Sequence, residues 1–166
     1  MNKKDDISIS RLNELFEYNQ ETGSLVWKDV TKRRDLIGSE AGCVKACGYI
    51  RIQINGSMYS AHRIAWALHF GEWPTLSIDH INGIKTDNKI SNLRDVSHRK
   101  NMMNSRIRKS NKCGFKGVYK KRNKYQAQIS VDGKLIRLGC FETAEMAHQA
   151  YSVAAKKYHG EFSRVS

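Results

Sequence analysis

Hydrophobic residues recur along the first half of the chain at spacings that change between helical and strand-like. In residues 9–19 they fall three or four positions apart, which predicts an amphipathic helix, and a short strand is expected at 25–27. Isoleucine at alternate positions in residues 48–54 predicts a half-buried strand, and the Asn-Gly pair after it predicts a hairpin turn into a return strand at 57–60. Residues 61–70 return to helical spacing and stop at a glycine, which commonly ends a helix.

The second half of the chain predicts a hairpin, a linker, and a small sheet with one helix. Residues 75–104 fit the order strand, loop, strand, helix, and the polar, basic residues 105–113 have the composition of a linker. Three further strands are expected at 117–120, 125–131 and 135–140, with an Asp-Gly turn between the last two. The elements together predict an α+β fold built from small antiparallel sheets.

A single helix is expected near the end of the chain. Thr143 is suited to its N-cap, and Gly160 is suited to end it. Its apolar face is expected to contain Ala147, Ala150, Tyr151, Ala154 and Tyr158. This face would pack on the sheet that precedes it.

Length and composition limit the classes of protein to consider. The 166 residues suit one ordinary domain or two small ones, and a hydrophobic content of 40% is enough for a core. The longest apolar run, residues 64–68, is too short to cross a membrane, and the polar residues 1–10 hold no signal-peptide core, so we expect a cytoplasmic protein without a membrane partner. The cysteines are too few for a disulfide scaffold and lack zinc-site spacing, so we expect them to act as small buried apolar residues. They are Cys43, Cys47, Cys113 and Cys140.

The formal net charge of +13 is concentrated in one part of the chain. Residues 1–98 hold 13 Lys and Arg against 12 Asp and Glu, whereas residues 99–166 hold 16 against 4, a net charge of +12. A basic excess confined to 68 residues, interleaved with Tyr and Gln in strand-like segments, is typical of a nucleic-acid-binding surface. A basic membrane-surface helix would have a different pattern.

The run of residues with the most specific chemistry lies between positions 79 and 104. Asp79-His80 ends a short apolar strand, Asn92 follows His80 by twelve residues, and Asn101 follows Asn92 by nine. With the intervening runs Asp-His-Ile-Asn-Gly and Asp-Asn-Lys-Ile-Ser-Asn-Leu-Arg, this order resembles the HNH nuclease family over about residues 47–104. The resemblance is to phage and homing-type members.

The resemblance implies a ββα-metal module, in which two strands and a helix hold a single divalent ion. It implies that His80 is the general base, that Asn92 holds its imidazole in position, and that Asp79 and Asn101 are the metal ligands. It also covers His62 and Arg63, which we expect to position the hairpin rather than to catalyse.

These residue types suit hydrolysis of a phosphodiester bond independently of the resemblance. Histidine can activate water near pH 7, and a cation neutralises charge that develops on the phosphate. A carboxylate with a carboxamide oxygen is a hard donor set that favours Mg²⁺ or Mn²⁺, whereas Zn²⁺ would prefer histidine where Asn101 stands. His98 is a rival ligand, and a contribution from Asn104 stays open.

Residues 115–165 resemble an AP2-type DNA-binding domain, in which a three-stranded sheet packs on one helix. The resemblance rests on the runs Phe-Lys-Gly-Val-Tyr from 115, Tyr-Gln-Ala-Gln-Ile from 125, Arg-Leu-Gly-Cys-Phe from 137 and Thr-Ala-Glu-Met-Ala-His-Gln-Ala-Tyr from 143. It implies that the sheet face opposite the helix enters the major groove of DNA. Alternation supports this, because Tyr125, Ala127, Ile129 and Val131 share an apolar face and the residues between them are polar.

The positions that the resemblance assigns to DNA lie in and around this sheet. Glutamine can read adenine and arginine can read guanine, while lysine mostly contacts phosphate. Plant-type members carry several arginines and tryptophans where this chain has other residues, so their target sequence does not transfer. The expected DNA-binding residues are Lys116, Gly117, Tyr119, Lys121, Arg122, Lys124, Gln126, Gln128, Ser130 and Arg137.

The sequence therefore predicts a monomeric, site-directed endonuclease for double-stranded DNA, located in the cytoplasm, and in that of a bacterial host if a phage encodes it. The expected parts are an N-terminal lead-in (1–46), an HNH nuclease domain (47–104), a basic linker (105–113) and an AP2-like domain (114–166). Two alternatives stay open: a non-catalytic DNA-binding regulator with a decayed nuclease module, and a nuclease for RNA or structured nucleic acid. Whether one strand or both are cut also stays open.

Overall fold

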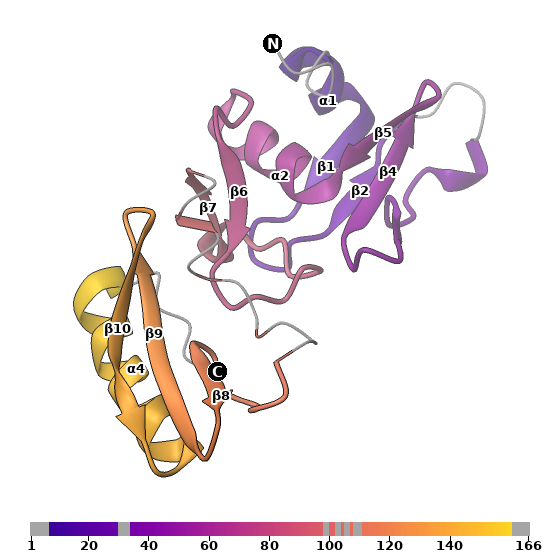
Figure 1. Cartoon of the computed structure of the whole chain (residues 1–166). Coiled ribbons are helices and arrows are strands. Elements are labelled where there is room, and N and C mark those ends of the chain that lie inside the picture. Colours follow the sequence, from indigo (N-terminus) through magenta and orange to yellow (C-terminus); the bar gives the residue numbers. More distant parts are fainter. Residues whose placement is uncertain are drawn as a thin grey trace. The chain divides into compact units, whose positions relative to one another are not determined.

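The computed structural model describes residues 7–29, 34–97, 100–101, 104, 107 and 111–160. The chain divides into two compact units, Met1–His98 and Arg99–Ser166 (Figure 1). Both units combine helices with small antiparallel sheets, so the structure shows the mixed composition that the sequence predicts. Among the described residues, no helix combines the length and apolar character needed to span a membrane.

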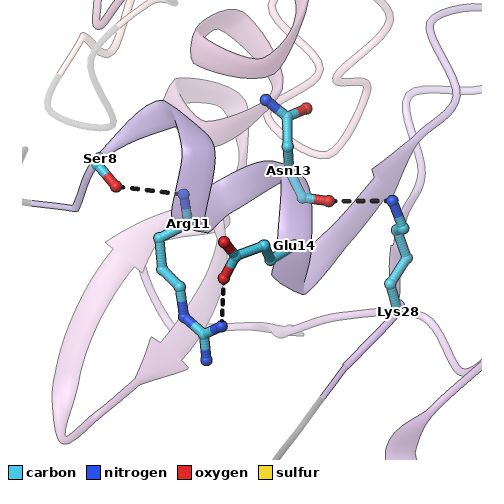
Figure 2. Close-up of polar contacts among 5 residues, drawn as sticks. All are labelled: Ser8, Arg11, Asn13, Glu14 and Lys28. Carbon is cyan, nitrogen blue, oxygen red and sulfur yellow. Dashed lines mark hydrogen bonds and ion pairs between the residues drawn. The ribbon is translucent and has the colours of Figure 1, made fainter.

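The first unit begins with α1 (Ile9–Leu15), which is capped by a side chain. The backbone N–H of Arg11 donates to Ser8 Oγ over 3.2 Å, which satisfies one of the amide groups that a helix start leaves unpaired. The Lys28 ammonium donates to the Asn13 carbonyl over 3.0 Å (Figure 2). This second bond ties the last turn of the helix to the residue that follows Trp27.

The sequence predicts that this helix continues to residue 19, but it ends at Leu15. Phe16–Tyr18 instead form β1, which pairs antiparallel with β2 (Leu25–Trp27). Phe16 lies opposite Trp27, both side chains are buried, and their ring centroids are 4.5 Å apart. Burial of this aromatic pair in a hairpin outweighs the local helical spacing.

A three-stranded sheet and a helix complete the main core of the first unit. The sheet order is β3-β4-β5, with β3 at Cys43–Val44, β4 at Ile50–Ile54 and β5 at Ser57–Ser60. Asn55 and Gly56 both have positive φ (48° and 82°), which confirms the predicted Asn-Gly hairpin turn. Helix α2 (Ala61–Phe70) follows directly and ends at a left-handed Gly71, and a short 3-10 turn, η1, occupies Arg34–Leu36.

The N-terminal lead-in shares one hydrophobic core with the segment that follows it. Buried side chains of α1, β1 and β2 pack with those of β4, β5 and α2, including Leu12, Phe16, Ile52 and Ile64. A smaller cluster joins α2 to the next hairpin through Ala65, Ile78 and Leu93. That hairpin consists of β6 (Ser77–His80) and β7 (Leu93–Val96), with the 3-10 turn η2 (Ile90–Asn92) before β7.

Within residues 111–160, the second unit contains a three-stranded antiparallel sheet of order β10-β9-β8 and the helix that packs on it (Figure 1). The strands are β8 (Val118–Lys121), β9 (Lys124–Val131) and β10 (Lys134–Phe141), and the helix is α4 (Ala144–His159). Asp132 and Gly133 form the β9–β10 turn with φ of 50° and 79°, as the Asp-Gly pair predicts. The Thr143 side chain caps α4 by accepting a hydrogen bond from the Met146 N–H over 3.3 Å, also as predicted.

The buried face of α4 differs at its C-terminal end from the one that the sequence predicts. Tyr158 is 43% exposed, so it is not part of the core. Ala155 and His159 are buried instead, and His159 Nε2 lies 3.0 Å from the Ser130 carbonyl oxygen. A partner on the neighbouring strand makes burial of an imidazole favourable at this position.

The four cysteines also differ from expectation. All four are free thiols, but Cys43, Cys47 and Cys140 are exposed and Cys113 is half-buried. The first two lie on or beside the short edge strand β3, whose residues are exposed on both faces. Cys140 projects from β10 on the side away from α4, because it pairs with Gln126 rather than with a residue that packs on the helix.

Candidate active site

The hairpin β6–β7 carries the two residues with which the predicted catalytic run begins. Asp79 lies opposite Arg94 and His80 lies opposite Leu93, and both Asp79 and His80 are buried (6% and 4% exposed). Neighbouring residues of a strand project to opposite faces, so the carboxylate and the imidazole have different surroundings.

His80 is held on one side by a carboxamide and lies against two aromatic rings. Its Nε2 lies 3.1 Å from Asn88 Oδ1, and its ring centroid lies 5.2 Å from that of His62, edge-on, and 5.9 Å from that of Tyr49. Burial is the main cause that lowers the pKa of His80, against the opposing effects of Asn88 and two carboxylates. The imidazole is therefore neutral near pH 7 and can accept a proton.

His62 lies directly beside His80 and is more deeply buried than the sequence indicates. It is 8% exposed, and among the described residues nothing forms a hydrogen bond with its Nδ1. Burial first, and then the positive charge that His80 can carry, lower the pKa of His62 to about 3. Its neighbour Arg63 donates to the carbonyls of Leu76 (2.9 Å) and Pro74 (3.0 Å), which ties α2 to the segment that enters β6.

The Asn92 side chain bonds to the backbone of the loop between β6 and β7. Its Nδ2 donates to the Asp87 carbonyl over 2.8 Å, and its Oδ1 accepts from the Asn82 N–H over 2.9 Å. The carboxamide therefore closes the loop between β6 and β7 by bonding to its backbone at two points. Asn88 is an asparagine whose side chain lies 3.1 Å from His80 Nε2, and the role of Asn92 in positioning the imidazole stays a prediction.

Asp79 forms an ion pair that bears on its expected role as a metal ligand. Arg94 Nε and Nη2 donate to Asp79 Oδ2 over 2.9 and 2.7 Å, and the two side chains are only 15% (Arg94) and 7% (Asp79) exposed. The pair comes from directly opposed strand positions, which makes its geometry a consequence of the β6–β7 register. The guanidinium of Arg94 gives this buried carboxylate a cation partner, which offsets part of the cost of burying it.

The other residues considered for a metal site lie beyond the hairpin. Asn101 is half-buried in a helical segment at the start of the second unit, Asn104 is buried, and His98 lies outside the described residues. Within the described part of the chain, no three His, Cys, Asp or Glu side chains group together as metal ligands. The expected set of one carboxylate and one carboxamide does not depend on such a group, and its oxygen donors fit a hard divalent ion.

Most of the predicted DNA-binding residues share one face of the sheet β8–β10, here named the open face. Ala127 and Ile129 of β9 pack on α4, so the residues that alternate with them point away from the helix. Register extends this face to the neighbouring strands, because Tyr119 pairs with Gln126 and Arg137 with Gln128. The expected residues on the open face are Tyr119, Lys121, Lys124, Gln126, Gln128, Ser130 and Arg137.

The remaining predicted DNA-binding residues have other positions. Gly117 has a φ of 72°, and a Cβ there would lie 2.1 Å from Tyr151 Cδ2, so this glycine permits close packing of the sheet on α4. Arg122 is exposed in the β8–β9 turn, and Lys116 precedes β8. On the open face itself, Lys124 pairs with Glu142 over 2.8 Å, which partly offsets its charge.

Sequence reasoning missed two neighbours of His80, Asn88 and Tyr49. Asn88 stands in the quoted Asp-Asn-Lys run, but it reads there as an ordinary loop residue. In the structure Asn88 is only 2% exposed. A buried polar side chain needs a hydrogen-bond partner, but burial in a polar loop cannot be recognised from the sequence. Tyr49 lies within the strand predicted at 48–54, and nothing in the sequence indicates that its ring packs near His80.

Comparison with known proteins finds similarities over this part of the chain. Residues 59–103, which span α2 and the β6–β7 hairpin, match a family model described as HNH endonuclease. The chain is 33% identical over 105 residues, 61% of its length, to a protein of Acanthamoeba polyphaga mimivirus described as an uncharacterized HNH endonuclease. The chain spans about half the length of that relative (54%). No solved structure matches the present chain. The matched residues include the buried Asp79-His80 pair of the β6–β7 hairpin.

Proposed function

We propose that this protein is a metal-dependent DNA endonuclease in which His80 is the general base. The observation that carries the proposal is the state of His80 within the matched residues: a buried, neutral imidazole with one nitrogen engaged by Asn88. The other nitrogen is then the one that takes a proton from the attacking water. His62 and Tyr49 pack on the ring and limit its rotation.

Asp79 and Asn101 would hold the divalent ion, with Mg²⁺ or Mn²⁺ the best match to their oxygen donors. When bound, the ion supplies a positive charge at the phosphate, which stabilises the charge that develops in hydrolysis. Arg94 fixes the position of the Asp79 carboxylate through two hydrogen bonds to Oδ2.

The second unit would dock on double-stranded DNA through the open face, as in the AP2-like domain that its sequence resembles. The net charge of +12 in residues 99–166 and the exposed Lys and Arg side chains support this role. Gln128 and Arg137, paired across β9 and β10, have the donor and acceptor groups for base contacts in the major groove. Cutting would belong to residues 47–104 and site choice to 114–166, in a cytoplasmic monomer whose one site cleaves one strand at each binding event.

The decisive experiment is incubation of supercoiled plasmid with the full chain and Mg²⁺ or Mn²⁺, with EDTA as the blank. We expect conversion to nicked circles that EDTA prevents. His80→Ala should abolish cleavage while it leaves DNA binding within about threefold, because the base acts on the reaction rather than on affinity. His69→Ala, an exposed histidine of α2, is the matched control and should cut as wild type does.

Three results would each overturn part of the proposal. Binding without cleavage under every divalent ion tried would favour the non-catalytic regulator, and cleavage by His80→Ala at the wild-type rate would exclude His80 as the base. Equal affinity for RNA and DNA duplexes of the same sequence would contradict the DNA assignment.

The open face is tested separately by Arg137→Ala in a binding assay. We expect weaker binding to the preferred site and a loss of discrimination there of about 1–3 kcal/mol. Lys156→Ala, on the exposed side of α4, is the control. Equal losses in the two variants would mean that the open face does not read sequence.

A further inference from the structure

The side chain of Asn88 is one of the largest fully buried groups of the first unit, although it lies in a polar loop. It is 2% exposed, and its Oδ1 lies 3.1 Å from His80 Nε2. Since a carboxamide oxygen can only accept a hydrogen bond, this contact requires the proton of the neutral imidazole to be on Nε2. The lone pair of the ring is then on Nδ1.

A second residue holds Asn88 from far away in the sequence. The Tyr18 hydroxyl, at the end of β1, donates to the Asn88 carbonyl oxygen over 2.7 Å across a separation of 70 residues. Burial raises the pKa of Tyr18 to about 12, with a smaller contribution from Asp87, so its hydroxyl keeps the donated proton. A further bond, from the Ile90 N–H to the Gln20 carbonyl (3.3 Å), joins the same two segments.

The turn between β1 and β2 is in backbone contact with the loop that contains Asn88. Gly23 has a φ of 79°, and a Cβ there would lie 2.5 Å from the backbone N of Lys89 and 2.6 Å from the carbonyl carbon of Asn88. Only glycine combines that backbone conformation with that approach. The turn and the loop are thus packed with no room for a side chain at this point.

We propose that Asn88 is a positioning residue that sets the tautomer and orientation of His80, and that the β1–β2 hairpin holds it through Tyr18 and Gly23. The inference rests on the proposed function only in taking His80 as the base. It gives the N-terminal lead-in a part in catalysis, since the lead-in supplies the surface on which the His80 partner is fixed. Tyr18 and Gly23 act through Asn88, and Asn88 acts through His80.

The first test reads the tautomer directly and needs no activity. Long-range ¹H–¹⁵N spectra of the full chain distinguish a histidine protonated on Nε2 from one protonated on Nδ1. We expect His80 to be on the Nε2–H side in wild type, to lose that preference in Asn88→Ala, and to regain it in Asn88→Asp, which restores an accepting oxygen. An Nδ1–H signal in wild type, or an unchanged Nε2–H signal in Asn88→Ala, would overturn the proposal.

The second test measures the single-turnover rate of cleavage and the affinity for DNA separately. Asn88→Ala should slow cleavage about 100-fold with affinity within about threefold, because misplacement of a base affects the reaction and not docking. Tyr18→Phe, which keeps the ring and removes only the tether, should slow it about tenfold. Asn13→Ala, an exposed asparagine of α1, is the control and should match wild type.

The outcomes separate this inference from the proposed function. If wild type cuts and Asn88→Ala and Tyr18→Phe both cut at the wild-type rate, the positioning role is excluded while the nuclease stands. If wild type does not cut, the nuclease proposal fails and the spectra still decide the tautomer. If Asn88→Ala does not fold, both measurements are made on Tyr18→Phe and Asn88→Asp instead. A wild-type cleavage rate together with an unchanged spectrum in Tyr18→Phe would contradict the role of the Tyr18 hydrogen bond to Asn88.

Discussion

Acidification should destabilise the first unit through His62. The folded chain lowers the pKa of this histidine from its usual 6.5 to about 3, mainly because the side chain is buried. Between those two pH values the unfolded chain binds a proton that the folded chain does not. The contribution of His62 to stability is therefore complete above about pH 6.5 and is lost as the pH falls toward 3.

The magnitude follows from the two pKa values. Between the two pKa values, the free energy of unfolding falls by about 1.4 kcal/mol for each unit by which the pH is lowered. The fall is smaller close to pH 6.5, where the unfolded chain is only partly protonated, so lowering the pH from 7 to 5 costs about 2 kcal/mol in total. Because pH 5 lies well above 3, this number depends on the unfolded value and hardly on the folded one. Loss of about 2 kcal/mol is a large part of the stability of a small unit.

The assay is urea unfolding at pH 7 and pH 5, followed by tryptophan fluorescence. Trp27, Trp66 and Trp73 all lie in the first unit, so the signal reports that unit alone. His62→Phe keeps a ring against Tyr49 and cannot titrate, so it should lose about 2 kcal/mol less than wild type between the two pH values. His80, whose pKa is also lowered, is common to both proteins and cancels in the difference.

A matched variant guards this comparison. His69 is exposed on the same helix, so His69→Phe should follow wild type at both pH values. A difference below about 0.5 kcal/mol between wild type and His62→Phe would refute the reasoning, because it would mean that the folded chain protonates His62 as readily as the unfolded chain does.

Two further substitutions test the packing of each unit. Arg94→Ala should lower the stability of the first unit by about 3 kcal/mol at neutral pH, because it removes the arginine that pairs with the buried Asp79 carboxylate. If Asp79 is a metal ligand, added Mg²⁺ should restore part of this loss in urea unfolding. An unchanged urea midpoint without metal would contradict a stabilising ion pair. Gly117→Ala should destabilise the second unit by at least about 2 kcal/mol, since its Cβ would meet Tyr151 and its φ is 72°, whereas Gly114→Ala, with a similar φ of 74° and nothing within 4 Å, should cost less. Amide hydrogen exchange of β8 to β10 measures both glycine variants, and equal protection would show that the contact with Tyr151 is not what limits position 117.

Local patterns were sufficient where neighbours in the sequence decide the structure. The Asn-Gly and Asp-Gly turns, the cap at Thr143 and the inward face of β9 all depend on residues a few positions apart, and the structure confirms them. The same holds for Asp79 and His80, whose place at the end of β6 follows from the short apolar run before them.

Local patterns were insufficient where a distant partner decides. Phe16 leaves the helical pattern because Trp27 buries it in a hairpin, and His159 replaces Tyr158 in the core because the Ser130 carbonyl lies within reach. The contact of His80 with Asn88 belongs to this class as well, since a buried carboxamide eight residues away looks like any loop asparagine.

The sequence by itself determined the residue types of the site, their order and the division of charge between the two parts of the chain. Only the tertiary structure decided which side chain holds His80, since Asn88 owes its position to Tyr18, 70 residues before it. The physical reason is that hydrogen bonds and burial select partners by distance in space, and a pattern read along the chain contains no such distance.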